Sequence, residues 1–192
     1  MEIIRIAKGG LKKEMEDWYR TRTQKHIYLV GKYCKKVAEE FEEFEELRER
    51  LKVHDDSKFE EPEQSPYVFI TWKYKCEDSG RDFDECKPPE DIDDLMHEAT
   101  THHITKNSHH PEFHAPNFSL NKDDRDGIPD EMVDATSMPR LDVAEMVCDW
   151  MSVSEERGNT PKSWADMNVN KRWKFTKEQS DLIYEIIEDV WE

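Results

Sequence analysis

Apolar residues recur at a spacing of three to four residues along two stretches of the chain, which is typical of amphipathic helices. The first stretch runs from about Leu11 to Val53, either unbroken or interrupted near 20–23. Its apolar stripe consists of His26, Leu29, Val30, Tyr33, Val37, Phe41, Phe44, Leu47 and Leu51. The second lies near the carboxyl end, at 176–191. Its stripe consists of Leu182, Ile183, Ile186, Ile187, Val190 and Trp191.

Start and stop signals add further helices. Thr176 and Gln179 form a capping box that begins the last helix. Ser137, placed before Met138 and Pro139, predicts the start of a helix that ends at Gly158.

The middle of the chain is less regular. A short helix is expected over 67–74, although the same residues also suit a strand. Asp91 or Asp93 caps a helix that runs to about His103. The remaining segments, 1–10, 76–86 and 104–137, are expected to be an extended arm, a loop and irregular chain. Together, these segments predict an all-α protein of five to seven helices, in which residues 1–192 form a single domain.

Acidic residues fill the positions between the apolar ones in the first helix. They are Glu39, Glu40, Glu42, Glu43, Glu45, Glu46 and Glu49. A charge run between periodic apolar residues predicts a solvated helix face.

Composition limits the partners. Charged residues make up 38% of the chain and mean hydropathy is -1.00, yet six Trp, eight Phe and six Tyr indicate a folded core. The net charge of -17 disfavours duplex nucleic acid and anionic membranes as partners. A small anionic substrate remains compatible, because a bound cation inverts the local field.

The four cysteines, at 34, 76, 86 and 148, form no CxxC pair. They predict reduced thiols and a cytoplasmic protein. The first ten residues have the pattern of neither a signal peptide nor a transmembrane segment.

Six of the eight histidines fall between positions 97 and 114, namely His97, His102, His103, His109, His110 and His114. Imidazole binds zinc, iron, nickel and manganese, so the cluster indicates metal binding, with a His-rich polar loop as the alternative. The pair His54-Asp55 strengthens the metal interpretation. With His26 on the preceding helix and Asp149 on a distant one, it would hold a metal and leave positions for water and substrate.

The order His26, His54-Asp55, Asp149 resembles the pattern of HD-domain metal-dependent phosphohydrolases. The run from His54 to Phe59 (HDDSKF) is similar to one in a small phage-associated branch of that superfamily, of unknown function. That branch also has a His-His-Pro-Glu element and a late Asp-Trp pair, found here as HHPE at 109–112 and as Asp149-Trp150. The resemblance covers roughly residues 24–152.

The resemblance implies an HD-domain-like helical bundle in which 76–89 and 115–136 are loop insertions. It also implies one or two divalent ions (Mn, Fe, Co, Ni or Zn). His103, His109 and His110 would bind a second metal or the phosphate, and spacing alone does not separate His103 from His102 or His109 from His110.

Lys58 and Glu145 are candidate catalytic residues. The resemblance implies that Lys58 contacts phosphate, with a surface lysine at a helix end as the alternative. Glu145 lies one turn before Asp149, where it would orient a histidine ligand or act as a general base, unless it is a surface glutamate.

Two other runs carry weaker signals. Residues 124–130 resemble a calcium loop but have the wrong frame, since Lys122 and Val133 occupy the end positions. Residues 171–174 are interpreted as a solvated basic turn, with a small anion patch as the alternative.

These patterns predict an enzyme that hydrolyses a nucleotide or other phosphomonoester, located in the cytoplasm, of the host if a phage encodes it. Two alternatives stay open. One is a di-iron oxygenase on the same scaffold, and the other is a non-catalytic, metal-stabilised acidic module that inhibits a host protein. The metal, the substrate and the oligomeric state are not determined by sequence.

Overall fold

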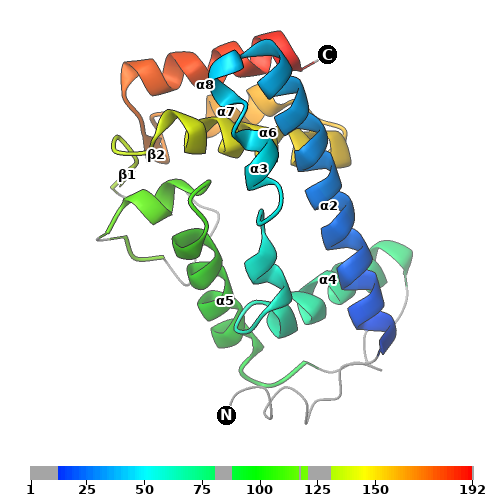
Figure 1. The fold of residues 1–192 in the computed structure, drawn as a ribbon. Helices are drawn as coiled ribbons and strands as arrows, with labels where there is room; N and C mark the ends of the chain where they lie inside the picture. The colour runs from blue at the N-terminus through cyan, green and yellow to red at the C-terminus, as the bar shows by residue number, and fades with distance from the viewer. Residues whose placement is uncertain (1–12, 81–87, 117, 121–130, 192) are drawn as a thin grey trace. The chain divides into compact units, whose positions relative to one another are not determined.

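The described part of the chain is mostly helical, which confirms the all-α prediction (Figure 1). The computed structural model describes residues 13–80, 88–116, 118–120 and 131–191. Within them the α-helices are α2 (Lys13–Glu40), α3 (Leu47–Arg50), α4 (Gln64–Ser79), α5 (Ile92–Lys106), α6 (Arg140–Arg157), α7 (Pro161–Asn168) and α8 (Lys177–Val190). The 3₁₀ helices are η1 (Glu42–Phe44), η2 (Asp56–Phe59) and η4 (Pro111–His114), and the strands are β1 (Val133–Asp134) and β2 (Trp173–Lys174).

The chain divides into two compact units. Unit 1 comprises the described residues up to Lys25 and those in 55–103, and unit 2 comprises 26–54 and those from Ile104 onward. Each unit has a hydrophobic core of its own. The prediction of a single domain over 1–192 stays a prediction.

The core of unit 2 is built on α6, which packs against α7 and α8. The stripe of α8 buries Leu182, Ile183, Ile186, Ile187 and Val190, as its spacing predicts. The predicted capping box of Thr176 and Gln179 is present. Gln179 also donates to the backbone oxygens of Ala135 and Met138, so it joins the start of α8 to the segment before α6.

The core of unit 1 joins the first half of α2 to α4 and α5. Its buried residues are Met15, Tyr19, Val68, Phe69, Trp72, Cys76 and Leu95. Residues 67–74 are helical, and α4 extends well beyond them at both ends. Cys76 therefore lies in a helix rather than in the predicted loop, and α4 ends at Gly80, whose φ of 63° suits glycine. The rest of that loop, from 81 to 86, lies outside the described residues.

The first helix ends earlier than predicted. α2 passes through 20–23 without a break and stops at Glu40, because Phe41 has an extended backbone (φ -122°, ψ 99°). The chain continues through η1 and α3, which keep Phe44 and Leu47 buried. The apolar stripe therefore correctly predicted that these side chains are buried, but it wrongly predicted one continuous helix.

Other boundaries also differ. α5 reaches Lys106, so the irregular segment begins later than predicted, and it contains η4 and β1. α6 begins at Arg140, after Pro139 as N-cap, and not at Ser137, whose Oγ donates to the carbonyl of His114. It ends at Gly158 as predicted.

α7 and the two strands were not predicted. Thr160 caps α7 and Pro161 follows it, a start signal that the sequence does contain. β1 and β2 pair in parallel, with Asp134 opposite Lys174. Within the basic run at 171–174, Trp173 is buried in the core and Lys174 pairs with Asp134 at 3.0 Å. The run is thus a turn and a strand, and the anion-patch alternative gains no support.

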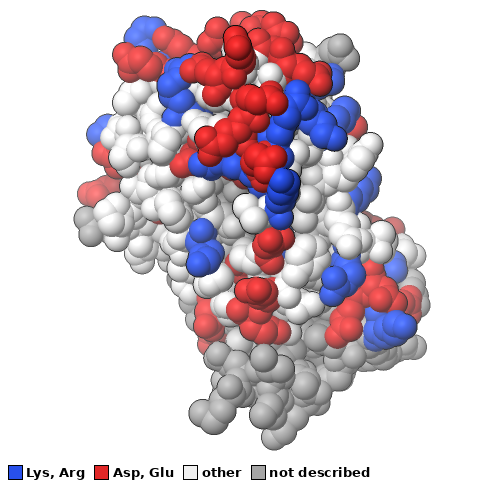
Figure 2. All heavy atoms as spheres, in the orientation of Figure 1, with Lys and Arg blue, Asp and Glu red and all other residues white. Residues whose placement is uncertain are grey.

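The acidic run from Glu39 to Glu49 is exposed throughout, which confirms a solvated face. Figure 2 shows acidic side chains gathered on this face together with Lys and Arg. Cys34, Cys76 and Cys148 are buried free thiols. Among the described helices, none has the length and apolar content needed to cross a bilayer. The arm at 1–10 and the calcium-like loop at 124–130 lie outside the described residues.

Candidate metal centre

Three carboxylates follow one side of α6 in unit 2. Asp142, Glu145 and Asp149 are three and four residues apart, so they lie on one helix face. Asp142 and Glu145 are buried and Asp149 is half-buried, because most of α6 is packed in the core. Charged groups in such a position need partners, and histidines and an arginine from other segments provide them.

His26, on α2, meets Asp149. Its Nε2 lies 3.0 Å from Oδ1 of Asp149, and its Nδ1 lies 3.2 Å from Oγ of Ser152. The Ser152 hydroxyl donates to the backbone oxygen of Asp149, so its oxygen can accept from Nδ1–H of His26. In that tautomer the lone pair of Nε2 faces a carboxylate oxygen. A cation shared by the two atoms would satisfy both of them.

His54 meets Glu145. Nδ1–H of the buried His54 ring donates to Oε1 of Glu145 at 2.8 Å. A carboxylate on Nδ1 fixes the tautomer and leaves Nε2 as a ligand atom, as is usual for histidines that bind metals. The rings of His54 and His26 lie with their centroids 6.1 Å apart.

His26, His54 and Asp149 each offer one donor atom, and these atoms all lie within 4.8 Å of one another. Ligands of one transition-metal ion lie about 3–4.5 Å apart when each is about 2.0–2.3 Å from the ion. Two imidazole nitrogens and a carboxylate oxygen are a donor set that zinc, iron, manganese, cobalt and nickel accept. The three residues thus fit a divalent cation.

A second group shares His54. His54, His109 and Glu145 also place donor atoms within 4.8 Å of one another, and all three are buried. Nδ1 of His109 lies 3.7 Å from Oε1 of Glu145, and the rings of His109 and His54 have centroids 4.4 Å apart. His110 lies beside His109, with ring centroids also 4.4 Å apart. Of the two histidines that spacing could not separate, His109 is therefore the one beside Glu145.

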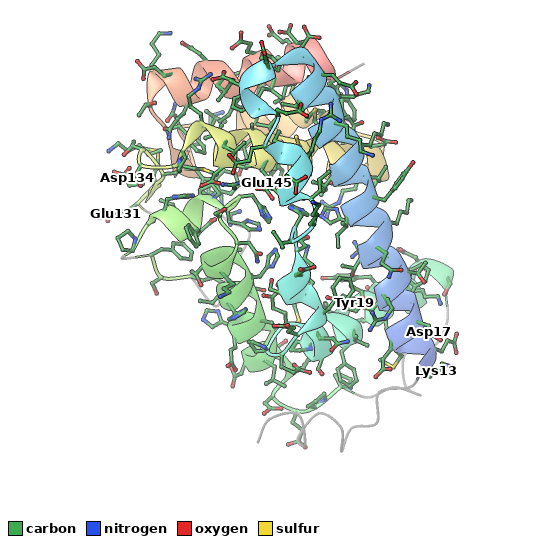
Figure 3. All side chains as sticks on the ribbon, in the orientation of Figure 1. Lys13, Asp17, Tyr19, Glu131, Asp134 and Glu145 are labelled. Carbon is green, nitrogen blue, oxygen red and sulfur yellow. The ribbon has the colours of Figure 1, made fainter. Side chains whose placement is uncertain are left out.

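Arg50 completes the polar cluster of unit 2. Its Nη1 donates to Oε2 of Glu145 at 3.0 Å, to Oγ of Ser108 at 3.2 Å and to Oδ1 of Asp142 (Figure 3 labels Glu145 on α6). Burial alone would lower the pKa of Arg50, but the hydrogen bond to Glu145 and the charge of Asp142 outweigh it and raise this pKa. Nε2 of His114 also lies 3.4 Å from Oδ2 of Asp142.

The fourth predicted ligand, Asp55, belongs to unit 1. It is buried, has a left-handed backbone (φ 61°) and accepts from Nζ of Lys58 at 2.5 Å. Asp tolerates this conformation better than most residues. Lys58 is therefore engaged in an ion pair, and its backbone oxygen accepts from the Tyr19 hydroxyl at 2.7 Å. Lys58 is thus more than a surface lysine.

Unit 1 also contains a residue that the sequence did not single out. Glu63 is fully buried and accepts from Nδ1–H of His102 at 2.7 Å and from Nδ1–H of His103 at 2.9 Å. Burial alone would raise the pKa of Glu63, but the hydrogen bond and charge of His103 and the bond from His102 outweigh it and lower this pKa. Nε2 of His103 lies 3.6 Å from Oδ1 of Asp55. No local signal distinguishes Glu63 from the other acidic residues.

Residues 15–189 match the model of one family, described as a family of unknown function (DUF5662). No curated protein matches the chain, and no solved structure matches it.

Proposed function

The chain belongs to the family DUF5662, and from the donor atoms that meet in unit 2 we propose that it is a metal-dependent phosphohydrolase. The substrate class is a nucleotide or another phosphomonoester. The observation that carries the proposal is the convergence of His26, His54 and Asp149 from three separate segments. Their order along the chain is the one that the HD-domain resemblance uses.

The residues of unit 2 have distinct roles in this proposal. His26, His54 and Asp149 would hold one divalent transition-metal ion, with Asp55, next to His54 in the chain, as the further ligand that the resemblance implies. A bound ion of this kind activates water near neutral pH and offsets charge on a phosphoryl oxygen. Three or four protein ligands leave room for both.

Glu145 orients His54 by accepting from Nδ1–H, so that Nε2 keeps its lone pair. His109 is proposed to donate to a phosphoryl oxygen or to bind a second ion, because it is buried beside the same carboxylate. His110 and His103 keep the same proposed roles, which rest on the resemblance. A nucleotide is favoured as substrate by analogy with the superfamily.

The test is phosphate release from a panel of nucleoside mono- and triphosphates, with Mn²⁺, Co²⁺, Ni²⁺ or Zn²⁺ added to untagged protein. Metal content is measured in parallel by elemental analysis. His26→Ala and Asp149→Asn should lose both metal and activity. His97→Ala and Asp189→Asn are matched controls, because neither residue belongs to a metal-donor group among the described residues, and both should behave as wild type.

Other outcomes point to the alternatives. Bound metal without phosphate release from any substrate would favour the metal-stabilised binding module, for which the charge of -17 is suited to basic partners. Bound iron with consumption of oxygen would favour the oxygenase. Wild-type protein that binds no divalent metal would refute the proposal.

A further inference from the structure

Arg50 occupies a central position beside the candidate metal centre without offering a ligand. We propose that Arg50 is a positioning residue that holds Glu145 in the orientation that His54 needs to bind a metal. The inference deepens the proposed function and rests on its metal site. Neither the sequence pattern nor the resemblance assigns a role to Arg50.

The contacts around Glu145 divide between its two oxygens. Oε2 accepts from Nη1 of Arg50 at 3.0 Å, and Oε1 accepts from Nδ1–H of His54 at 2.8 Å. A carboxylate with one oxygen fixed by a guanidinium cannot turn its other oxygen away from the histidine without breaking an ion pair. The position of Arg50 thus sets the direction of Oε1.

Arg50 is itself held in place. Nη1 also contacts Oγ of Ser108 and Oδ1 of Asp142, one turn before Glu145 on α6. Its backbone oxygen accepts from the backbone N–H of His54. The same residue therefore contacts the histidine through the main chain and the carboxylate through the side chain, and so fixes both ends of the His54–Glu145 hydrogen bond.

The experiment compares metal affinity in Arg50→Gln, Arg50→Lys and one matched control. The control is Arg48→Gln, which removes a neighbouring arginine of α3 that pairs with Glu45. Affinity for Zn²⁺ is measured by competition with a chromophoric chelator, and the visible absorption of Co²⁺-loaded protein reports the coordination of the ion.

Arg50→Gln should bind Zn²⁺ about ten- to a hundredfold more weakly than wild type and should change the Co²⁺ spectrum, the range expected when the partner that orients a ligand is lost. Arg50→Lys should recover part of the affinity, because its ammonium still pairs with Glu145. Arg48→Gln should match wild type. Wild-type affinity and spectrum in Arg50→Gln would overturn the inference.

Two further outcomes are decisive. If Arg50→Gln does not fold, the comparison moves to Arg50→Lys and Arg48→Gln, and wild-type affinity in both would overturn the inference. Wild-type protein that binds metal but hydrolyses nothing would end the phosphohydrolase proposal and leave the role of Arg50 to be decided by its variants. Wild-type protein that binds no metal would overturn both.

Discussion

Nδ1 of His54 and Oε1 of Glu145 lie 2.8 Å apart, although the two residues are 91 positions apart in the chain. The hydrogen bond joins the segment after α3 to the middle of α6 within the interior of unit 2. Because Glu145 aligns His54 and also contacts Arg50, it connects a candidate ligand to the residues that support it. Its replacement therefore tests the whole arrangement.

Glu145→Gln should weaken divalent metal binding by about ten- to a hundredfold, because a neutral amide holds His54 and Arg50 less firmly than a carboxylate does. Titration with Zn²⁺ in a competition assay measures the change. Glu155→Gln is the matched control, since Glu155 is on the same helix but pairs with Lys32 and Tyr33. Equal affinity in both variants would show that Glu145 does not orient a ligand.

The sequence predicted much of the site and less of its surroundings. His26, His54 and Asp149 could be found because their order matches a known pattern, and Glu145 because it lies one turn from Asp149. Glu63 and Arg50 could not be found in this way. Their roles depend on contacts 40 and 95 residues away in the chain, and no local periodicity encodes such contacts.

The same difference between local signals and contacts of distant residues applies to the fold. The apolar stripe of α8 and its capping box are local signals, and both were correct. The end of α2 at Glu40 was not predicted, because the stripe continues through η1 and α3 with buried Phe44 and Leu47. An apolar pattern of this kind records which side chains are buried, whereas the break depends on the backbone of Phe41.

Lys58→Ala should destabilise unit 1, because it leaves the buried carboxylate of Asp55 without its ammonium partner. The side chain of Asp55 is 1% exposed and that of Lys58 21%, so we expect a loss of about 1–3 kcal/mol, below the cost for a fully buried pair. Urea unfolding of metal-free protein measures it.

A double-mutant cycle separates the ion pair from other effects of Lys58. If the pair is responsible, Lys58→Ala should cost less in the Asp55→Asn background than in wild type. Lys52→Ala is the control, since its partner Glu49 is exposed. Additive effects would show that the two side chains do not stabilise each other, and only then would Lys58→Ala be a clean probe of catalysis.

Asp134 should titrate at unusually low pH (Figure 3 labels Asp134). The side-chain and backbone hydrogen bonds of Thr136, followed by the bond from Lys174, lower its pKa from 3.8 to about 2. A folded-state pKa below the unfolded value contributes stability that is present above about pH 4 and lost as pH falls through about 2. Carboxyl NMR shifts of Asp134 measure the pKa directly.

Asp134→Asn should accordingly reduce the dependence of unfolding on pH between about 4 and 2. Asp189→Asn, an exposed change on α8, should leave that dependence unaltered. A pKa of Asp134 near 3.8 would contradict the hydrogen bonds that its carboxylate accepts from Thr136 and Lys174.

Gln179→Leu should cost about 2–4 kcal/mol in the free energy of unfolding. The change removes the bond that the Gln179 side chain accepts from the backbone N–H of Thr176 and the bonds that it donates to the carbonyls of Ala135 and Met138, each worth about 0.5–1.5 kcal/mol. Thr176→Ala, which removes only the cap, should cost about 1 kcal/mol. Equal losses in the two variants, measured by urea unfolding, would mean that the bonds to the carbonyls contribute nothing.

Metal binding should stabilise unit 2 through the segments that hold His26, His54 and Asp149. A ligand that binds only the folded state adds about 2.7 kcal/mol at a hundred times its Kd. Zn²⁺ should therefore slow amide hydrogen exchange in α6 and in the part of α2 around His26, and a chelator should reverse the effect.

His26→Ala should abolish the added protection, whereas His97→Ala, on α5, should preserve it. Because most of α6 is buried, we expect its amides to exchange slowly even without metal, and α2 near His26 then offers the more sensitive readout. Protection that rises equally in His26→Ala and wild type would place the ion elsewhere, and the donor group of His54, His109 and Glu145 would then be tested by His109→Ala.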